Sequence, residues 1–274
     1  MLRQRLVSGL LLAIVLVGIV LLAPHPVFAA AFAVLYGIGA MEWSRLTSLD
    51  SPAGETGYIG IFIALVALLW WLQGSFIAHL WVTAAALFWL VIHLLLLRYQ
   101  QSADHVPRWQ RQLELAGLLL LPAAWLAFVE LHAIHPGWVL YIMTLCAVAD
   151  SFAFLFGKTF GKRKLAPQLS PGKTIEGAAG GLFGVLLVAL GSSLFWQHFS
   201  GLELLLFIVL SLLAGLVSIE GDLFESLIKR EAGQKDSGRI LPGHGGILDR
   251  FDSHIAAAPV FYLGLKGVLA WAQR

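Results

Sequence analysis

Charged residues are scarce in this chain. Only 12% of its 274 residues are Asp, Glu, Lys or Arg, about half the share of an ordinary soluble domain, while 59% are hydrophobic. So little charge excludes an ordinary soluble globular domain. The sequence therefore predicts a polytopic membrane protein.

Cysteine is almost absent as well. The one cysteine, Cys146, lies within an apolar run. A single thiol excludes an intrachain disulfide, and its apolar surroundings indicate a packing role.

Nine apolar segments are each close to the roughly 20 residues that a helix needs to cross a bilayer. Helices are expected because an isolated strand could not pair its backbone in lipid. The first segment, preceded by Arg3 and Arg5, also resembles a signal peptide, but its length and the spans that follow favour a transmembrane helix. The fold predicted is an all-α bundle of about nine transmembrane helices, at residues 6–23, 27–44, 57–73, 76–97, 113–131, 138–157, 177–199, 203–221 and 254–272.

Lysine and arginine are distributed unevenly in this topology. Sixteen of the 18 fall on the side that holds the N-terminus. By the positive-inside rule that side is cytoplasmic. The N-terminus is therefore expected inside and the C-terminus outside.

The two parts of the chain differ in polar content. Residues 1–135 carry no motif that indicates chemistry, and Glu42 and Glu130, near segment ends, are expected to contact water. Residues 136–274 hold most of the candidate functional groups. We therefore expect N-terminal transmembrane helices followed by a catalytic transmembrane region with its site at the cytoplasmic face.

Asp150 and Lys173 are the first candidates in the second part. Asp150 is flanked by apolar residues within a span, which marks a functional candidate, although it could instead reach the nearby interface. Gly172-Lys173-Thr174 resembles the end of a P-loop, but Pro167 stands where that motif needs glycine. Lys173 and the helix that follows could still bind an anion.

The densest charge lies in residues 220–252, which hold twelve charged residues. If the eighth helix continues past Gly221, Asp222, Ser226 and Lys229 lie along one face, with Arg230 beside them. A solvated amphipathic helix with ordinary salt bridges remains the alternative for Glu225, Glu231 and Arg230.

A polar loop and a second group of carboxylates follow. The loop contains Lys235 and the glycine-rich run His244-Gly245-Gly246, whose backbone N–H groups can approach a ligand closely. Asp249 and Asp252, on either side of Arg250, can face one point. Carboxylates without Cys or His clusters favour Mg²⁺, and Mg²⁺ with Lys and Arg is typical of phosphoryl or nucleotidyl transfer.

These residues carry a resemblance to a known family. The strongest part runs Ser226-Leu-Ile-Lys229-Arg230, Lys235-Asp236, and Pro242-Gly-His244-Gly245-Gly246-Ile-Leu-Asp249-Arg250-Phe-Asp252. Weaker likenesses are Gly221-Asp222-Leu-Phe-Glu225-Ser226, Ala149-Asp150-Ser151 and Ser170-Pro-Gly-Lys173-Thr174-Ile-Glu176-Gly177. Together they resemble the phosphatidate cytidylyltransferases (CDP-diacylglycerol synthases) over residues 147–254.

The resemblance implies a nucleotidyltransferase that converts CTP and phosphatidate to CDP-diacylglycerol and pyrophosphate in phospholipid biosynthesis. It implies Mg²⁺, with room for a second, monovalent cation such as K⁺, and a homodimer. The partners expected are CTP, phosphatidate and membrane lipids, without nucleic acid. The location expected is the bacterial inner membrane, as a multi-pass protein.

The roles expected divide the site residues into three sets. Lys229, Ser226 and Asp249 are the catalytic candidates. The substrate-binding candidates are Lys173, Arg230, Lys235, His244, Gly245, Gly246 and Arg250, and the metal-ligand candidates are Asp222, Asp249, Asp252 and Asp150. Two alternatives stay open: a CTP-dependent polyprenol or phytol kinase, and a cation-coupled transporter, although a transporter favours carboxylates nearer mid-membrane.

Overall fold

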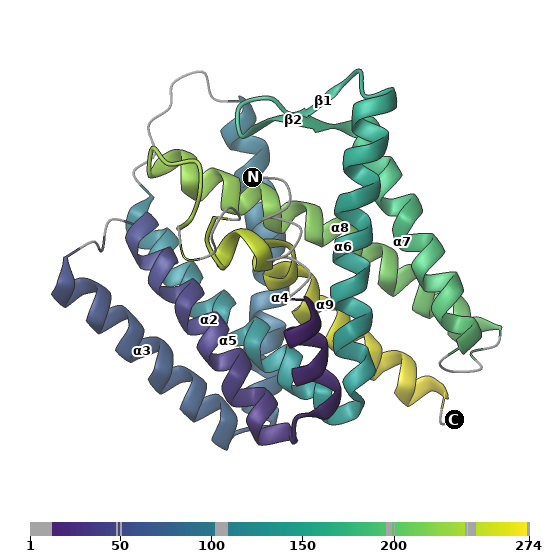
Figure 1. The fold of residues 1–274 in the computed structure, drawn as a ribbon, viewed down its shortest axis with the longest axis horizontal. Helices are drawn as coiled ribbons and strands as arrows, with labels where there is room; N and C mark the ends of the chain where they lie inside the picture. The colour runs from purple at the N-terminus through teal and green to yellow at the C-terminus, as the bar shows by residue number, and fades with distance from the viewer. Residues whose placement is uncertain are drawn as a thin grey trace.

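The computed structural model describes residues 13–47, 49, 51–101, 109–195, 199, 201–238, 240 and 245–272. Within them, eight helices are long and apolar enough to cross a membrane. This confirms the predicted all-helical, polytopic membrane fold (Figure 1). The helices are α2 (His25–Leu46), α3 (Pro52–Trp71), α4 (Phe76–Gln101), α5 (Gln110–Ile134), α6 (Pro136–Phe160), α7 (Ile175–Phe195), α8 (Leu202–Glu231) and α9 (Leu248–Ala272).

The first predicted span is described only in part. Ala13–Leu22 forms a short apolar helix, and residues 6–12 lie outside the described residues. The Val20 carbonyl oxygen lies 3.1 Å from Nε2 of His132 on α5. A crossing at 6–23, like the cytoplasmic N-terminus, stays a prediction.

Helix α8 continues well beyond the predicted end of its span. It ends at Glu231, as the amphipathic interpretation of residues 222–230 required. The extension is stable as a helix because it has an apolar face to bury: Phe224, Leu227 and Ile228 are all buried in the core. Its opposite face carries Asp222 and Lys229.

A small hairpin joins α6 to α7, where the sequence predicted only a basic loop. Strand β1 (Lys164–Ala166) pairs antiparallel with β2 (Ser170–Thr174), and the hairpin lies at one end of α6 and α7 in Figure 1. Ala166 and Leu169 are fully buried, which anchors the hairpin. The Glu176 carboxylate fixes its base by accepting hydrogen bonds from the backbone N–H groups of Lys162 and Arg163.

Glycine allows two helix pairs to approach closely. On α7, a side chain at Gly181 would meet the carbonyl oxygen of Ala149 on α6. On α8, a side chain at Gly221 would meet the backbone of Asp252 on α9. These two pairs, α6 with α7 and α8 with α9, have the most extensive contacts of the bundle. Their close packing is what brings the carboxylates of three helices to one place.

Apolar side chains form the core of the bundle and are also exposed on its outer surface. Helix α5 is the most enclosed of the candidate spans and packs on both α2 and α9, so the two parts of the chain share one core. Helix α3 is the least enclosed, and Ile61, Ile63 and Trp71 are exposed on it. Exposed apolar faces of this extent suit contact with lipid. The functional division at residue 135 stays a prediction.

Candidate active site

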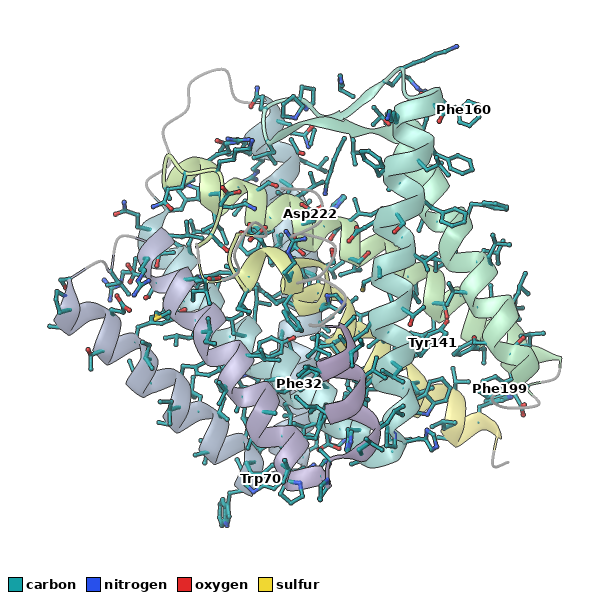
Figure 2. The ribbon with its side chains drawn as sticks, in the orientation of Figure 1. Phe32, Trp70, Tyr141, Phe160, Phe199 and Asp222 are labelled. Atoms are coloured by element: carbon teal, nitrogen blue, oxygen red, sulfur yellow. The ribbon has the colours of Figure 1, made fainter. Side chains whose placement is uncertain are left out.

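A cavity of about 660 Å³ opens between α6, the hairpin, α7, α8 and α9. We call it the charged chamber. Figure 2 shows one of its residues, Asp222, on α8 in the middle of the bundle. Six carboxylates and four cationic side chains line the chamber: Asp150, Asp222, Glu225, Asp236, Asp249 and Asp252, with Lys158, Lys173, Lys229 and Arg250.

Lys229 is held between two carboxylates. Its Nζ donates hydrogen bonds to Glu225 Oε2 at 2.6 Å and to Asp249 Oδ1 at 2.7 Å. Its side chain is only 14% exposed. A buried ammonium is costly unless opposite charges surround it, and here α8 and α9 each supply one. The pairing fixes the ammonium on the chamber wall.

Asp249 also organises the loop before α9. Its Oδ2 accepts hydrogen bonds from the backbone N–H groups of Ser237, at 3.0 Å, and Gly246, at 2.8 Å. Gly245 has φ of +82°, a conformation that favours glycine and turns the backbone toward this carboxylate. Both oxygens of Asp249 are therefore engaged by the protein.

Lys173 and Asp222 form an ion pair across the chamber. Lys173 lies on β2, so the hairpin positions this cation opposite α8. Both side chains are about one quarter exposed, at 25% and 29%. An ion pair open to this degree is available for exchange with a ligand phosphate.

Carboxylates outnumber cationic side chains in the chamber. Asp150 and Asp252 lie within electrostatic reach of each other and of Asp222. Asp252 uses Oδ1 to accept a hydrogen bond from the N–H of Ser253 at 2.7 Å. With six carboxylates beside four cationic side chains, the chamber has enough acidic groups to balance a bound cation.

The donor chemistry of the chamber fits Mg²⁺ bound together with a substrate. Among the described residues, no three His, Cys, Asp or Glu side chains converge closely enough to hold a metal ion. Mg²⁺ in nucleotide sites commonly takes only one or two carboxylates and completes its shell with phosphates and water. Oε1 of Glu225 is buried and, within the described part of the chain, has no hydrogen-bond partner, which adds an unsatisfied oxygen to the site.

Several predicted site residues lie away from the chamber wall. Ser226, Lys235, Gly245 and Gly246 are not among the residues lining it, and Lys235 is exposed. Arg230 is exposed, and its Nε donates to the Leu169 carbonyl oxygen at 3.4 Å, supporting the hairpin. His244 lies outside the described residues.

Three residues that were not among the predicted site residues belong to this region. Glu225 and Asp236 line the chamber itself. Glu42 is 1% exposed, so the expectation that it contacts water is wrong. The sequence did carry a signal, because Glu42 is flanked by the apolar Met41 and Trp43, much as Asp150 is flanked within its span.

Comparisons with known proteins give a consistent result over nearly the whole chain. The sequence profile described as "Cytidylyltransferase family" matches residues 3–267. A phosphatidate cytidylyltransferase of Pseudomonas aeruginosa is 38% identical over 274 residues, covering 99% of this chain and 98% of the relative. Proteins of the same name from Haemophilus influenzae and Bacillus subtilis are 36% and 31% identical, covering 95% of this chain and 97% and 96% of their own lengths.

Proposed function

The chain belongs to the cytidylyltransferase family, and we propose that it converts CTP and phosphatidate to CDP-diacylglycerol and pyrophosphate in the charged chamber. The observation that carries this proposal is the chamber itself, in a protein similar along its full length to phosphatidate cytidylyltransferases. Six carboxylates and two paired lysines suit a reaction whose charge is carried by phosphates.

The reaction needs no covalent intermediate with the protein. A phosphate oxygen of phosphatidate attacks the α-phosphorus of CTP and forms the new P–O bond. The bond from that phosphorus to the oxygen bridging to the β-phosphate breaks, and pyrophosphate leaves with the electron pair. Because phosphatidate is already a nucleophile, the protein has to position two anions and reduce their repulsion.

The cationic side chains of the chamber supply that charge. Lys173 exchanges its contact with Asp222 for a phosphate of CTP. Lys229, held by Glu225 and Asp249, presents its ammonium to the reacting phosphates, and Arg250 lines the same wall. Gly245 and Gly246 act indirectly, because the Gly246 N–H holds Asp249 on the chamber wall.

Asp222 is the carboxylate that we propose as the main Mg²⁺ ligand, supported by Asp150 and Asp252. When bound, Mg²⁺ neutralises the charge of the triphosphate. Asp249 can join this group only by giving up Lys229 or a loop N–H, so its main role in the structure is to hold Lys229 and the loop. A second, monovalent cation such as K⁺ belongs to the same proposal.

The lining of the chamber also suits an amphiphilic substrate. Besides the charged groups, it includes Phe154, Leu165 and Ile219, and Phe154 is 71% exposed on the outer face of α6. An apolar edge beside a charged interior matches a lipid whose phosphate enters while its chains remain in the membrane. This edge favours phosphatidate over a water-soluble phosphate monoester.

The protein is a multi-pass membrane protein, and we propose that the chamber faces the cytoplasm of a bacterial cell. Lys158, Arg163 and Lys164 lie at the chamber end of α6 and the hairpin, where the positive-inside rule places the cytoplasm. The three relatives named above are bacterial, which supports the inner membrane as its location. A homodimer is part of the proposal, and cross-linking in native membranes tests it.

Pyrophosphate release tests the reaction. The purified protein in detergent is given CTP labelled at the γ-phosphate, with and without phosphatidate and with and without Mg²⁺. We expect labelled pyrophosphate only when both are present. Label transferred to a lipid would instead establish a kinase, and metal-driven flux in vesicles without CTP consumption would establish a transporter.

A further inference from the structure

Glu42 is buried beneath the loop that precedes α9, although it lies in the part of the chain without a catalytic motif. It sits near the end of α2, and its carboxylate accepts three hydrogen bonds. Oε1 accepts the N–H of Ile247 at 3.1 Å. Oε2 accepts the N–H of Leu248 at 2.8 Å and the hydroxyl of Ser237 at 3.1 Å.

These contacts make Glu42 a cap for α9 supplied by a distant helix. The first N–H groups of a helix have no partner within it, and a negative charge at that end interacts favourably with the helix dipole. Leu248 is the first residue of α9, and Ile247 precedes it. Glu42 therefore satisfies the opening turn of the helix that carries Asp249 and Asp252.

The same carboxylate reaches Asp249 through Ser237. The Ser237 hydroxyl donates to Glu42 and accepts the N–H of Asp249 at 3.3 Å. The Ser237 N–H in turn donates to Asp249 Oδ2, and Asp249 Oδ1 accepts from Lys229. Glu42, Ser237, Asp249 and Lys229 thus form one continuous hydrogen-bonded chain from α2 to α8.

The loop is shaped around this carboxylate. A side chain at Gly238 would meet Oε1 of Glu42. A side chain at Gly246 would meet both oxygens of Glu42 and the Ser237 hydroxyl. A larger residue at either position would have to displace the Glu42 carboxylate, so the loop fits closely over this side chain.

We propose that Glu42 is a positioning residue for the transfer reaction, acting through Ser237 and the first turn of α9 to hold Asp249 and Lys229 in place. The proposal rests on the proposed function. Glu42 is not among the residues that line the chamber, so it acts without touching substrate. It makes the N-terminal helices part of the catalytic apparatus.

Glu42→Gln tests this role with little change in size. The amide keeps one acceptor oxygen but replaces the other with an NH₂ group. That NH₂ group then faces a backbone N–H or the Ser237 hydroxyl, which are themselves donors in these contacts. Glu130→Gln is the matched control, because Glu130 also accepts a backbone N–H, but from Gly74 at 3.0 Å in the loop after α3 and not from the start of α9.

We expect Glu42→Gln to lower kcat about 10- to 100-fold, with KM for CTP and phosphatidate within about threefold of wild type. Glu130→Gln should keep kcat within about twofold. A kcat for Glu42→Gln within twofold of wild type overturns the proposal. So does a loss of activity that matches the loss of folded protein. If Glu42→Gln does not fold, Ser237→Ala breaks the same chain by removing one hydroxyl and is expected to lower kcat in the same way.

Amide hydrogen exchange separates this proposal from the proposed function. Peptides covering residues 246–249 report the N–H groups of Ile247 and Leu248 without any substrate. We expect these to exchange at least about tenfold faster in Glu42→Gln and unchanged in Glu130→Gln. If wild type shows this protection but releases no pyrophosphate, the proposed function fails while the capping by Glu42 stands. Equal exchange in wild type and Glu42→Gln overturns the capping itself.

Discussion

Lys229 and Asp249 form a 2.7 Å ion pair that joins α8 to α9 inside the charged chamber. Glu225 completes the arrangement from the preceding turn of α8, with its Oε2 2.6 Å from Lys229 Nζ. The three side chains are 14%, 11% and 3% exposed, in the order Lys229, Asp249 and Glu225. Because the pair is shielded from water, removing one partner leaves an unbalanced charge inside the protein, which is far more costly than breaking a surface pair.

Asp249→Asn is expected to abolish turnover and to lower the thermal midpoint, while the protein still folds because Glu225 remains paired with Lys229. The amide keeps the shape of the side chain but removes a negative charge beside Lys229. Its NH₂ group would face hydrogen-bond donors, either the Lys229 ammonium or the N–H groups of Ser237 and Gly246. A loss of at least about 100-fold in kcat/KM is expected, as for other preorganised charged groups in active sites. The measurement is pyrophosphate release at saturating Mg²⁺, together with the thermal midpoint in detergent.

Glu55→Gln is the control for that variant. Glu55 forms an ion pair of the same length, 2.7 Å, with Arg45, but the Arg45 side chain is 50% exposed. Surface pairs of this kind contribute about 0–1 kcal/mol, so activity and stability should hardly change. Normal activity in Asp249→Asn would remove Asp249 from the site.

Lys173→Ala is expected to weaken CTP binding more than it slows the transfer. Lys173 loses a charge-assisted contact with phosphate, worth about 1.5–3 kcal/mol, so KM for CTP should rise at least about tenfold. Lys164→Ala on the neighbouring strand is the control, because Lys164 pairs in register with Thr174 and is exposed but does not line the chamber. Steady-state kinetics with varied CTP decide the matter, and equal effects of the two variants would contradict the role of Lys173.

The spans and the charged stretch could be predicted because their signal is local. An apolar run such as that of α4 determines its own helical form in lipid, whatever its neighbours are. The continuation of α8 to Glu231 was also readable, since Phe224, Leu227 and Ile228 recur on one side of a helix while Asp222 and Lys229 lie on the other.

What could not be predicted depends on contacts between distant segments. Glu42 and Leu248 are 206 residues apart, and nothing near Glu42 indicates which helix end it will cap. The β1–β2 hairpin was missed because its strands are short and the second contains Pro171 and Gly172, which are unfavourable in strands. It is stable through the burial of Ala166 and Leu169 against the bundle. The sequence could not decide whether Glu225 is solvated or part of the site, because its burial depends on where α9 packs against α8.

Gly181→Ala is expected to loosen the wall of the chamber by separating α6 from α7. Its methyl group would lie 2.9 Å from the Ala149 carbonyl oxygen, closer than real contacts allow. Overpacking of this kind costs about 1–3 kcal/mol. Gly191→Ala on the same helix is the control, because a methyl group there meets nothing within 4 Å. Thermal midpoints in detergent should fall for Gly181→Ala alone, and equal midpoints would contradict the close packing.

Asp150→Asn is expected to raise the Mg²⁺ concentration needed for half-maximal activity about tenfold. Asp150 lines the chamber within electrostatic reach of Asp222 and Asp252, so its charge favours any cation bound there even without direct contact. Removing the charge should weaken Mg²⁺ while kcat at saturating Mg²⁺ changes less. Chelation with EDTA should stop turnover of wild type, and added Mg²⁺ should restore it.

Glu220→Gln separates this effect from a general change in the charge of the protein. Glu220 lies on α8 and pairs with His93 at 2.8 Å, and it is not among the residues that line the chamber. Both variants remove one negative charge, so a shift caused by net charge alone would appear in both. A shift confined to Asp150→Asn places the cation in the chamber. An unchanged Mg²⁺ requirement in Asp150→Asn would mean that the carboxylates of α6 do not contribute to cation binding, and that the cation is held from α8 and α9 alone.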